Sequence, residues 1–434
     1  MNPFGSDDSG STLVAAVSAP VSVVRRTVAS DDVLQHGGIM SAAMLASGAL
    51  NYGYQVFMGR ALGPKQYGVF GAVFALVYLV NVLGRGIRFS ATRFAAEFAS
   101  ENRSVASFHA GFLARAALFA AVVFVAVLLT APVTVAFLGL GSSLPVVIVA
   151  ANGLFGLALT ANQGVFQGLQ RFGALGTYQV LLAALKLVVG VALVYAGYGV
   201  AGALGAVALA SFLVLVATTL HLRSSTGDRT GPATAFEYGR AYRYLPPAVL
   251  AGFCITVPGT VDVLVVKHFF SAADAGLYAA AAVLGKILVF LPMGISTALF
   301  PKVSNDRASG ESARRQRLFD RAVLYVGLLV GVGTLVLWVV PDLTVALVFG
   351  PAYAGAVPLV RWYGVAVLFV ALAIVVLNFQ LALDRTGFVY VFTAASVVEI
   401  LLLWVAHSSM VEVIQVILLV NGGLFAYGFI SVKS

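Results

Sequence analysis

The chain has 434 residues, of which 60% are hydrophobic and only 10% charged, and its mean hydropathy is +0.98. Soluble domains average about 25% charged residues, and a soluble protein could not hide this much apolar surface. The composition therefore excludes soluble enzyme folds, and it excludes intrinsic disorder, which needs low hydrophobicity. The single cysteine, Cys254, excludes an internal disulfide and a cysteine-based metal site, and the five histidines lie far apart in sequence, so no metal or cofactor is predicted.

Apolar stretches of about 20 residues, the length that crosses a bilayer as a helix, recur along the chain. After a flexible cytoplasmic tail over residues 1–35, the sequence predicts twelve spans. They are expected near residues 39–58, 66–84, 108–130, 145–168, 176–197, 199–221, 245–267, 275–300, 321–341, 356–381, 388–406 and 411–431. A membrane barrel would show short alternating segments instead. The expected fold class is an all-α, polytopic membrane protein.

The positive charges are distributed unevenly between the two sides of this arrangement. Nineteen of the 26 Lys and Arg residues fall in the tails and the even-numbered connections, and four fall within spans. The odd-numbered connections hold only Arg60, Lys65 and Lys267. Because cytoplasmic loops carry the excess of Lys and Arg, we predict a cell-membrane protein with both termini in the cytoplasm. The net charge of +9 is then a topology signal, and no nucleic-acid partner is expected.

The chain resembles itself at an offset near 210 residues. The matches, in common order along the two halves, are YGVFGAVF at 67–74 with AGLYAAAA at 275–282, TVAF at 134–137 with TVAL at 344–347, and LQRFG at 169–173 with LDRTG at 383–387. Each match is weak alone, but their shared order and nearly constant offset make coincidence a poor explanation.

Twelve spans then divide into two six-helix lobes, residues 36–221 and 245–434, joined by a polar and basic cytoplasmic linker at 222–244. An even number of spans in each half makes the halves parallel repeats, related by an axis along the membrane normal. Transporters built in this way bind their cargo near the midplane, between the halves. A rigid channel or membrane enzyme that arose from an old duplication is the alternative.

Three segments of the sequence carry a family resemblance: GRALGPKQYGVFG at 59–71, GRGIRFSATRFAAEF at 84–98 and VFGPAYAGAVPLVR at 348–361. They resemble the polysaccharide and lipid-linked oligosaccharide flippases, the Wzx-like branch of the superfamily that also holds multidrug (MATE) exporters and the lipid II flippase. The residues that fit the family pattern are Arg60, Leu62, Gly63, Tyr67, Gly68, Arg93 and Ala96.

The resemblance covers nearly the whole chain from about residue 36. It implies two six-helix bundles that form a V-shaped central cleft, lined by the first, second, seventh and eighth spans. The implied activity is the transfer of a sugar-loaded lipid phosphate from the cytoplasmic to the outer leaflet.

Charged residues inside spans are costly and are functional candidates for that reason. They are Arg115, Lys186, Lys286, Arg361, Asp262 and Glu399. Their net charge is positive, which suits an anionic lipid phosphate, whereas an exporter of cationic drugs should need an acidic cavity. Arg115 and Arg361 lie near span ends and can snorkel to the interface. Lys186 and Glu399 occupy roughly matching repeat positions outside the implied cleft, and structural pairing is expected for them.

Lys286, near the middle of the eighth span, is the first candidate for a phosphate contact, with snorkelling as the alternative. Asp262, in the seventh span, follows Pro258 by about one turn. Because Pro258 cannot donate to the carbonyl of Cys254, the helix should bend there, and Pro258 is the candidate hinge. A bend beside a carboxylate suits a moving helix that senses an ion or a proton. A salt bridge from Asp262 to Lys267 or Lys286 is the alternative.

Ser47, Asn51 and Gln55 form one polar stripe on the first span, which suits sugar hydroxyls, although hydrogen bonding between helices is equally reasonable. Arg85 and Arg88 lie at the cytoplasmic mouth of the second span. They could guide a head group inward or simply anchor the topology.

A flippase is the main hypothesis, and an ion-coupled exporter of small amphiphiles is the alternative in the same class. A membrane-embedded glycosyltransferase or polymerase is disfavoured, because the outer connections are short and the cytoplasmic loops lack a DxD or His/Asp cluster. No phosphate-binding G-x-x-x-x-G-K-[ST] motif occurs, so no ATP hydrolysis is expected. We expect no enzyme activity. The expected partners are a lipid-linked sugar, membrane lipids, a coupling ion or proton, and a polysaccharide polymerase or glycosyltransferase.

Overall fold

The computed structural model describes residues 32–226, 239, 249–250, 252–253, 256–290, 312–383 and 387–433. All elements in these ranges are helices, which confirms the predicted all-α membrane fold. The N-terminal lobe contains α2 (Asp32–Ser100), α3 (Val105–Leu129), α4 (Ala131–Leu138), α5 (Leu144–Gly168), α6 (Phe172–Leu193), the π-helical turn η1 (Val194–Tyr198) and α7 (Gly199–Thr226). The C-terminal lobe contains η2 (Val257–Gly259), α10 (Val261–Phe269), α11 (Ala272–Phe290), α13 (Ser312–Val339), α14 (Pro341–Val348), η3 (Pro351–Ala356), α15 (Val357–Ala382), α16 (Gly387–Val405) and α17 (Met410–Lys433).

Nine helices within the described ranges are long and apolar enough to cross a membrane. Two of them, Gly38–Ser100 with 63 residues and Phe172–Ser225 with 54 residues, are far longer than one crossing requires. Each contains a glycine with non-helical backbone angles, so each holds two of the predicted spans. The seventh and eighth predicted spans are described only in part, and the total of twelve stays a prediction.

The turn inside α2 is made by Gly63, whose φ of 69° and ψ of 168° lie outside the helical region. Glycine adopts such a positive φ without strain because it has no Cβ atom. Pro64 follows and has no amide hydrogen to continue the first helix. The segment that carries the family-like turn motif therefore reverses the chain between the first two predicted spans.

The seventh predicted span is interrupted rather than merely bent. Its described part makes a single 3₁₀ turn at η2, which contains Pro258, and a regular helix begins only at Val261. Thr260, between the two, has a φ of −139° and a ψ of −40°. The missing amide hydrogen of proline explains why the helix breaks at this point. Cys254 lies outside the described residues.

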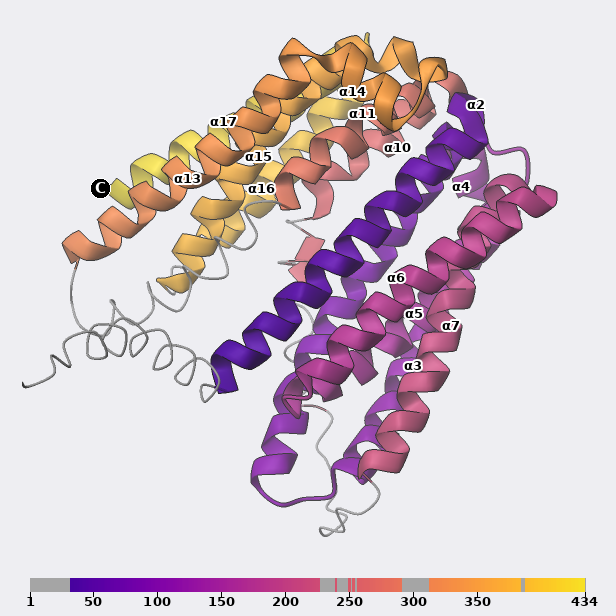
Figure 1. Cartoon of the computed structure of the whole chain (residues 1–434), viewed down its shortest axis with the longest axis vertical. Coiled ribbons are helices and arrows are strands. Elements are labelled where there is room, and N and C mark those ends of the chain that lie inside the picture. The colour runs from indigo at the N-terminus through magenta and orange to yellow at the C-terminus, as the bar shows by residue number, and fades with distance from the viewer. Residues whose placement is uncertain are drawn as a thin grey trace, which may run out of the picture.

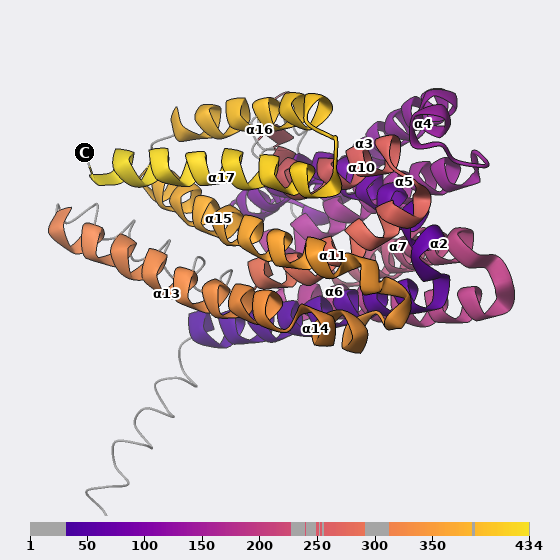
Figure 2. The ribbon, with the colours of Figure 1, turned by 90° about the horizontal axis from the view of Figure 1, so that it is seen from above.

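The two lobes form the arms of a V in Figure 1. Helices α2 to α7, in indigo to pink, make one arm, and α13 to α17, in orange and yellow, make the other. The arms meet where α2, α11 and α14 come together, and we call this the joined end. They diverge toward the opposite end, which we call the open end. Seen from above, α11 lies between the helices of the two lobes (Figure 2), and it packs against both α2 and α15.

The hydrophobic core is also divided between the two lobes. One cluster of buried residues is shared by both lobes, and it includes Tyr67 and Phe70 of α2 together with Tyr278 of α11 and Tyr353 of η3. A second cluster belongs to the N-terminal lobe alone, and a third belongs to the C-terminal lobe alone. The lobes therefore share a core near the joined end and have separate cores elsewhere.

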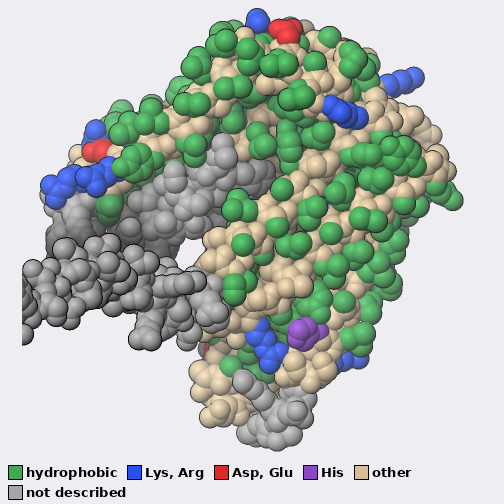
Figure 3. Space-filling model, in the orientation of Figure 1, with side chains coloured by type: hydrophobic (Ala, Val, Ile, Leu, Met, Phe, Trp, Pro, Cys, Tyr) green, Lys and Arg blue, Asp and Glu red, His purple; other side chains and the backbone are tan. Residues whose placement is uncertain are grey.

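Large apolar side chains cover the outside of both lobes (Figure 3). Leu118, Leu129, Leu335 and Leu347 are each 60 to 76% exposed. Such a contiguous apolar surface is unstable in water, and it fits lipid. Arginines and lysines gather toward the ends of the molecule in the same view, as expected for side chains that reach the interfaces.

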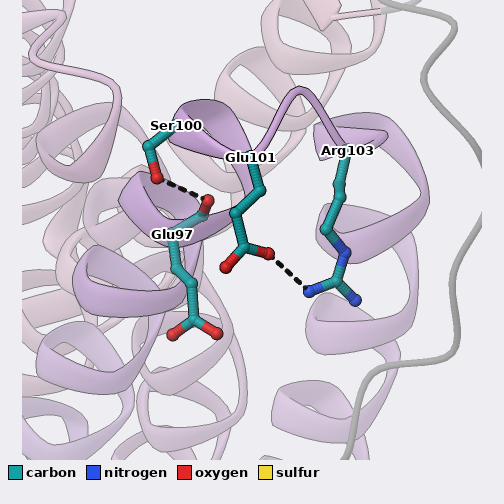
Figure 4. A network of polar contacts seen from close by, with 4 residues as sticks. All are labelled: Glu97, Ser100, Glu101 and Arg103. Carbon is teal, nitrogen blue, oxygen red and sulfur yellow. Dashed lines mark hydrogen bonds and ion pairs between the residues drawn. The ribbon is translucent and has the colours of Figure 1, made fainter.

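Polar contacts tie the chain together at the open end. Between α2 and α3, Arg103 forms an ion pair with Glu101 at 3.1 Å, and the Ser100 hydroxyl donates to the Glu97 carbonyl at 2.9 Å (Figure 4). Arg171, before α6, donates to Ser225 near the end of α7. The contact between Arg171 and Ser225 joins two of the predicted even-numbered connections, whereas the other two contacts are local.

The ends of other described segments lie at the open end as well. Helix α2 begins at Asp32, inside the predicted flexible tail, and helix α7 runs to Thr226, into the predicted linker. In the C-terminal lobe, Lys433 lies 3.8 Å from Asp320 near the start of α13. The start of α2 and the end of α17 therefore both lie toward the open end (Figure 1).

Candidate functional site

A buried carboxylate lies at the start of α10. Asp262 is 1% exposed, and its Oδ2 atom accepts hydrogen bonds from the hydroxyls of Tyr278 at 3.0 Å and Tyr363 at 2.8 Å. Its Oδ1 atom has no hydrogen-bond partner. Of the two lysines in the salt-bridge alternative, Lys267 donates to the Leu138 carbonyl instead, and Lys286 interacts electrostatically with Asp262 without a hydrogen bond among the described contacts. Asp262 is in the first turn of α10, where the helix dipole favours a negative charge.

A second buried carboxylate belongs to the same part of the lobe. Glu399 of α16 is 1% exposed, and it accepts a 3.0 Å hydrogen bond from the Asn421 amide of α17. Its charge interacts electrostatically with that of Asp262, and α10 packs against both α16 and α17. The Oε1 atom of Glu399 and the Oδ1 atom of Asn421 lack hydrogen-bond partners.

We call Asp262, Tyr278, Tyr363, Glu399 and Asn421 the acidic centre. Three of its buried oxygen atoms accept no hydrogen bond. A buried acceptor without a donor is costly. Two neighbouring buried carboxylates repel each other when both are ionised, and Lys286 supplies one positive charge against the two negative ones. This arrangement can hold a proton or a small oxygen-coordinated cation. Within the described ranges, no group of three or more His, Cys, Asp or Glu side chains gathers as a metal site would need.

Lys286 of α11 lies beside the interruption in the seventh span. The side chain is half-buried, and its Cε atom lies 3.6 Å from the position that a Cβ atom on Gly259 would take. Its ammonium interacts electrostatically with Asp262. The candidate phosphate contact and the candidate ion-sensing carboxylate are therefore neighbours across the broken helix.

The polar stripe of the first span meets a lysine in the N-terminal lobe. Asn51 donates to the Ser47 carbonyl at 2.7 Å and accepts from Lys186 of α6. The lysine is 8% exposed, and its Nζ atom lies 4.6 Å from the centre of the Tyr54 ring and 5.6 Å from that of Phe74. Amide and aromatic faces can stabilise a buried cation without a carboxylate.

Gln55 lies against the Tyr78 hydroxyl, and Tyr78 is half exposed. Asn51 is exposed, and Ser47 is half-buried with its hydroxyl on the Met44 carbonyl. All three polar side chains of the stripe therefore have partners within the N-terminal lobe, and a ligand would have to share or replace the contacts of Asn51 and Gln55.

Arg85 and Arg88 behave differently from one another. Arg85 is exposed, and its Cδ atom lies 2.6 Å from the position of a Cβ on Gly252, so it rests on the seventh span of the other lobe. Arg88 donates to the Gln167 side chain of α5 at 3.0 Å. Arg85 therefore lies between the lobes, and Arg88 fastens two helices of one lobe together.

Sequence reasoning missed three members of the acidic centre, Tyr278, Tyr363 and Asn421. It also missed the contact between Lys186 and Asn51. The internal repeat holds a signal for part of this, because Asn51 and Asp262 are 211 positions apart, and Lys186 and Glu399 are 213 apart. Matching positions in the two lobes therefore build two polar centres of opposite charge, in which Lys186 pairs with Asn51 and Glu399 pairs with Asn421.

The comparisons with known proteins agree with one another. A family described as polysaccharide biosynthesis proteins matches residues 33–306, more than half of the chain. No curated protein matches the sequence.

Among solved structures, an inward-facing multidrug resistance MATE family transporter of the MOP superfamily has a TM-score of 0.77 at 12% identity, covering 88% of this chain and 94% of its own. The lipid II flippase MurJ in an inward closed conformation has a TM-score of 0.73 at 14% identity, covering 91% and 87%. An outward-facing MATE transporter of the same superfamily has a TM-score of 0.64 at 13% identity, covering 91% and 95%. The fold is therefore that of the MATE and MurJ transporters.

Proposed function

Because the chain belongs to the polysaccharide biosynthesis protein family, we propose that it is a flippase that moves an anionic, lipid-linked saccharide from the inner to the outer leaflet by alternating access. The observation that carries this proposal is the one-sided closure of the two lobes. They share a buried core at the joined end and have separate cores toward the open end. Alternating access requires a fold whose lobes can separate at one end at a time.

The open end faces the cytoplasm in this proposal. Its connections carry the larger share of arginines, and the positive-inside rule assigns such connections to the cytoplasmic side. The higher TM-score for the inward-facing than for the outward-facing MATE transporter supports the same assignment. The conformation is then the one that admits cargo from the inner leaflet of the cell membrane.

Lys286 and Arg85 are the proposed contacts for the lipid phosphate. Lys286 sits beside the break in the seventh span, and Arg85 rests against that span from the other lobe. Both are long cations without a carboxylate hydrogen-bonded to them among the described contacts, and phosphate oxygens are strong acceptors for such donors. Asn51 and Gln55 are the proposed contacts for sugar hydroxyls. Arg88 donates to the Gln167 side chain, and its proposed role is to hold α2 and α5 of the N-terminal lobe together.

The acidic centre is the proposed coupling site, with Pro258 as the hinge. A proton or a monovalent cation would satisfy the unpartnered oxygens of Asp262, Glu399 and Asn421. Binding there would change the charge beside Lys286, which interacts with Asp262. Ion binding would then strengthen the hold of Lys286 on a phosphate, and release of the ion would favour release of the phosphate. We propose that a glycosyltransferase supplies the lipid-linked sugar on the inner side and that a polymerase consumes it on the outer side.

The second candidate function is an ion-coupled exporter of small amphiphiles. The acidic centre favours it, because a buried pair of carboxylates could attract a cationic substrate. The position of Lys286 beside Asp262 argues against it, since a lysine there opposes the entry of an organic cation.

A reconstituted transport assay separates the two functions. Purified protein in liposomes would receive either a fluorescent lipid diphosphate oligosaccharide, with leaflet exposure read by an impermeant quencher, or a fluorescent cationic amphiphile. We expect protein-dependent flipping of the lipid-linked sugar and no transport of the cation. Transport of the cation alone would refute the flippase and establish the exporter.

A further inference from the structure

The joined end is built from two contacts that mirror each other. Gly68 of α2 lies so close to the Ala272 carbonyl that a Cβ atom would clash with it, and Gly276 of α11 lies equally close to the Pro64 carbonyl. Gly68 and Gly276 are 208 positions apart, as are Pro64 and Ala272. The contact of Gly68 with Ala272 and the contact of Gly276 with Pro64 are therefore equivalent, and exchanging the two lobes converts one into the other. A twofold-like axis between the lobes has this property.

Two basic side chains extend this symmetry. Arg60 of α2 donates from Nε to the Val348 carbonyl at 2.7 Å and from Nη2 to the Leu347 carbonyl. Lys267 of α10 donates to the Leu138 carbonyl at 2.6 Å. Val348 and Leu138 are the last residues of the short helices α14 and α4, and they are 210 positions apart. Each lobe therefore sends one cation to the C-terminal end of the other lobe's short helix.

His268 completes the second contact. Its Nδ1 atom donates to the Phe137 carbonyl at 2.6 Å, so Lys267 and His268 together bond the carbonyls that correspond to the two held by Arg60. Its ring also stacks on Phe137, with centroids 4.2 Å apart. Arg60 of the N-terminal lobe binds both carbonyls with one guanidinium, whereas in the C-terminal lobe Lys267 and His268 bind one carbonyl each.

The chemistry of these contacts is specific. The last carbonyls of a helix lack intrahelical donors and carry the negative end of the helix dipole. A cation bonded to them is held more firmly than a neutral donor. It is held less firmly than in a buried ion pair, and breaking the contact leaves no unpaired carboxylate behind. Such a contact closes two lobes reversibly.

We propose that Arg60 and Lys267 are two equivalent latches that hold the joined end closed, and that both must release before the lobes separate there. The statement that this end faces outward, and that its opening releases cargo, rests on the proposed function. The latches themselves do not, because they are contacts between lobes whatever the cargo is.

Spin labels on the two lobes test the proposal without any cargo. The labels would replace Leu129 at the end of α3 and Leu343 of α14, which are 76% and 63% exposed and bond to neither latch. The background would carry Cys254→Ser. Distances would be measured by pulsed electron spin resonance on protein in lipid nanodiscs, for Arg60→Met, Lys267→Met and the double variant. Lys65→Met is the matched control, since Lys65 is an exposed lysine of the same turn with no contact to the other lobe among the described ones.

Lys267→Met should raise the ratio of the long-distance to the short-distance population by about tenfold, the effect of one charge-assisted hydrogen bond, because His268 keeps its own bond to Phe137. Arg60→Met removes two hydrogen bonds and should raise the ratio by at least as much. The double variant should show about the product of the two single effects. The control should match the parent protein. Unchanged distances in both single variants, or a change in only one of them, would overturn the proposal of two equivalent latches.

Lys267 is buried, so Lys267→Gln, which retains a donor amide, is measured beside the methionine variant and should shift the ratio less. A change in the population ratio for Lys267→Gln as large as that for Lys267→Met would contradict a role for the hydrogen bond from residue 267 to the Leu138 carbonyl. Normal latch behaviour in a protein that flips no lipid-linked sugar would refute only the proposed function.

Discussion

Tyr363 donates a 2.8 Å hydrogen bond to Asp262, although the two residues lie 101 positions apart and on different helices. Tyr278 donates to the same carboxylate oxygen, and the two tyrosine rings stand nearly perpendicular with centroids 5.8 Å apart. The second oxygen of Asp262 has no partner. One side of the carboxylate is therefore fixed by α11 and α15, and the other is left for a ligand.

Asp262→Asn should abolish the dependence of transport on an ion or proton gradient. The amide keeps the shape and accepts the tyrosine hydrogen bonds, but it carries no charge for a cation to neutralise. Transport into liposomes would be measured with and without an imposed proton, sodium or potassium gradient.

Asp342→Asn serves as the control, because Asp342 is an exposed aspartate in the first turn of α14. It should leave gradient dependence intact. Asp262→Asn transport that still responds fully to the gradient would contradict the coupling role of the acidic centre.

Tyr363→Phe should tighten cation binding at the acidic centre by about tenfold. The hydroxyl now neutralises part of the carboxylate charge, and a hydrogen bond to a charged group is worth about 1.5–3 kcal/mol. Without the Tyr363 hydroxyl, the Asp262 carboxylate would carry more unneutralised charge and would bind a cation more tightly. The measurement is the cation concentration that gives half of the rise in melting temperature, since a ligand that binds only the folded protein stabilises it.

The exposed Tyr325 of α13 supplies the matched substitution, Tyr325→Phe, which should not change that concentration. A higher half-effect concentration in Tyr363→Phe would mean that the tyrosine helps to bind the cation instead.

Lys286→Ala should reduce flipping of a lipid diphosphate at least tenfold, and Lys286→Arg should retain part of it. Arginine keeps a positive charge and can bond phosphate, whereas alanine removes both charge and donors. Initial flipping rates in liposomes would be compared at equal protein content. Lys65→Ala removes an exposed lysine at the joined end and should be neutral. A normal rate for Lys286→Ala would remove Lys286 from the pathway.

Gly68→Ala should weaken closure of the joined end. A Cβ atom there would clash with the Ala272 carbonyl, which is backbone and cannot rotate away. We expect easier labelling of cysteines introduced near this contact, together with a lower melting temperature, since overpacking typically costs about 1–3 kcal/mol.

Gly276→Ala should behave in the same way, because it meets the Pro64 carbonyl at the equivalent position. Gly53→Ala, on the same helix as Gly68 but with open space around it, is the control. Equal labelling in all three variants would show that the glycine contacts do not limit opening.

The sequence by itself determined the membrane class, most span positions, the side preference of the basic residues and the repeat. These follow from local composition, because a bilayer demands about 20 apolar residues for each crossing and a proline or glycine wherever the helix must break. The turn at Gly63 and a departure from regular helix at Pro258 were predictable for that reason, although the sequence predicted a bend at Pro258 and not an interruption.

Only the tertiary structure decided which polar groups meet. Asp262 accepts hydrogen bonds from two tyrosines that the sequence did not single out, and Lys186 donates to Asn51. The spans are apolar on nearly every face, so hydrophobic periodicity does not say which face packs on which neighbour. Helix pairing in lipid depends on shape and on hydrogen bonds between helices, and those properties exist only once the helices are in contact.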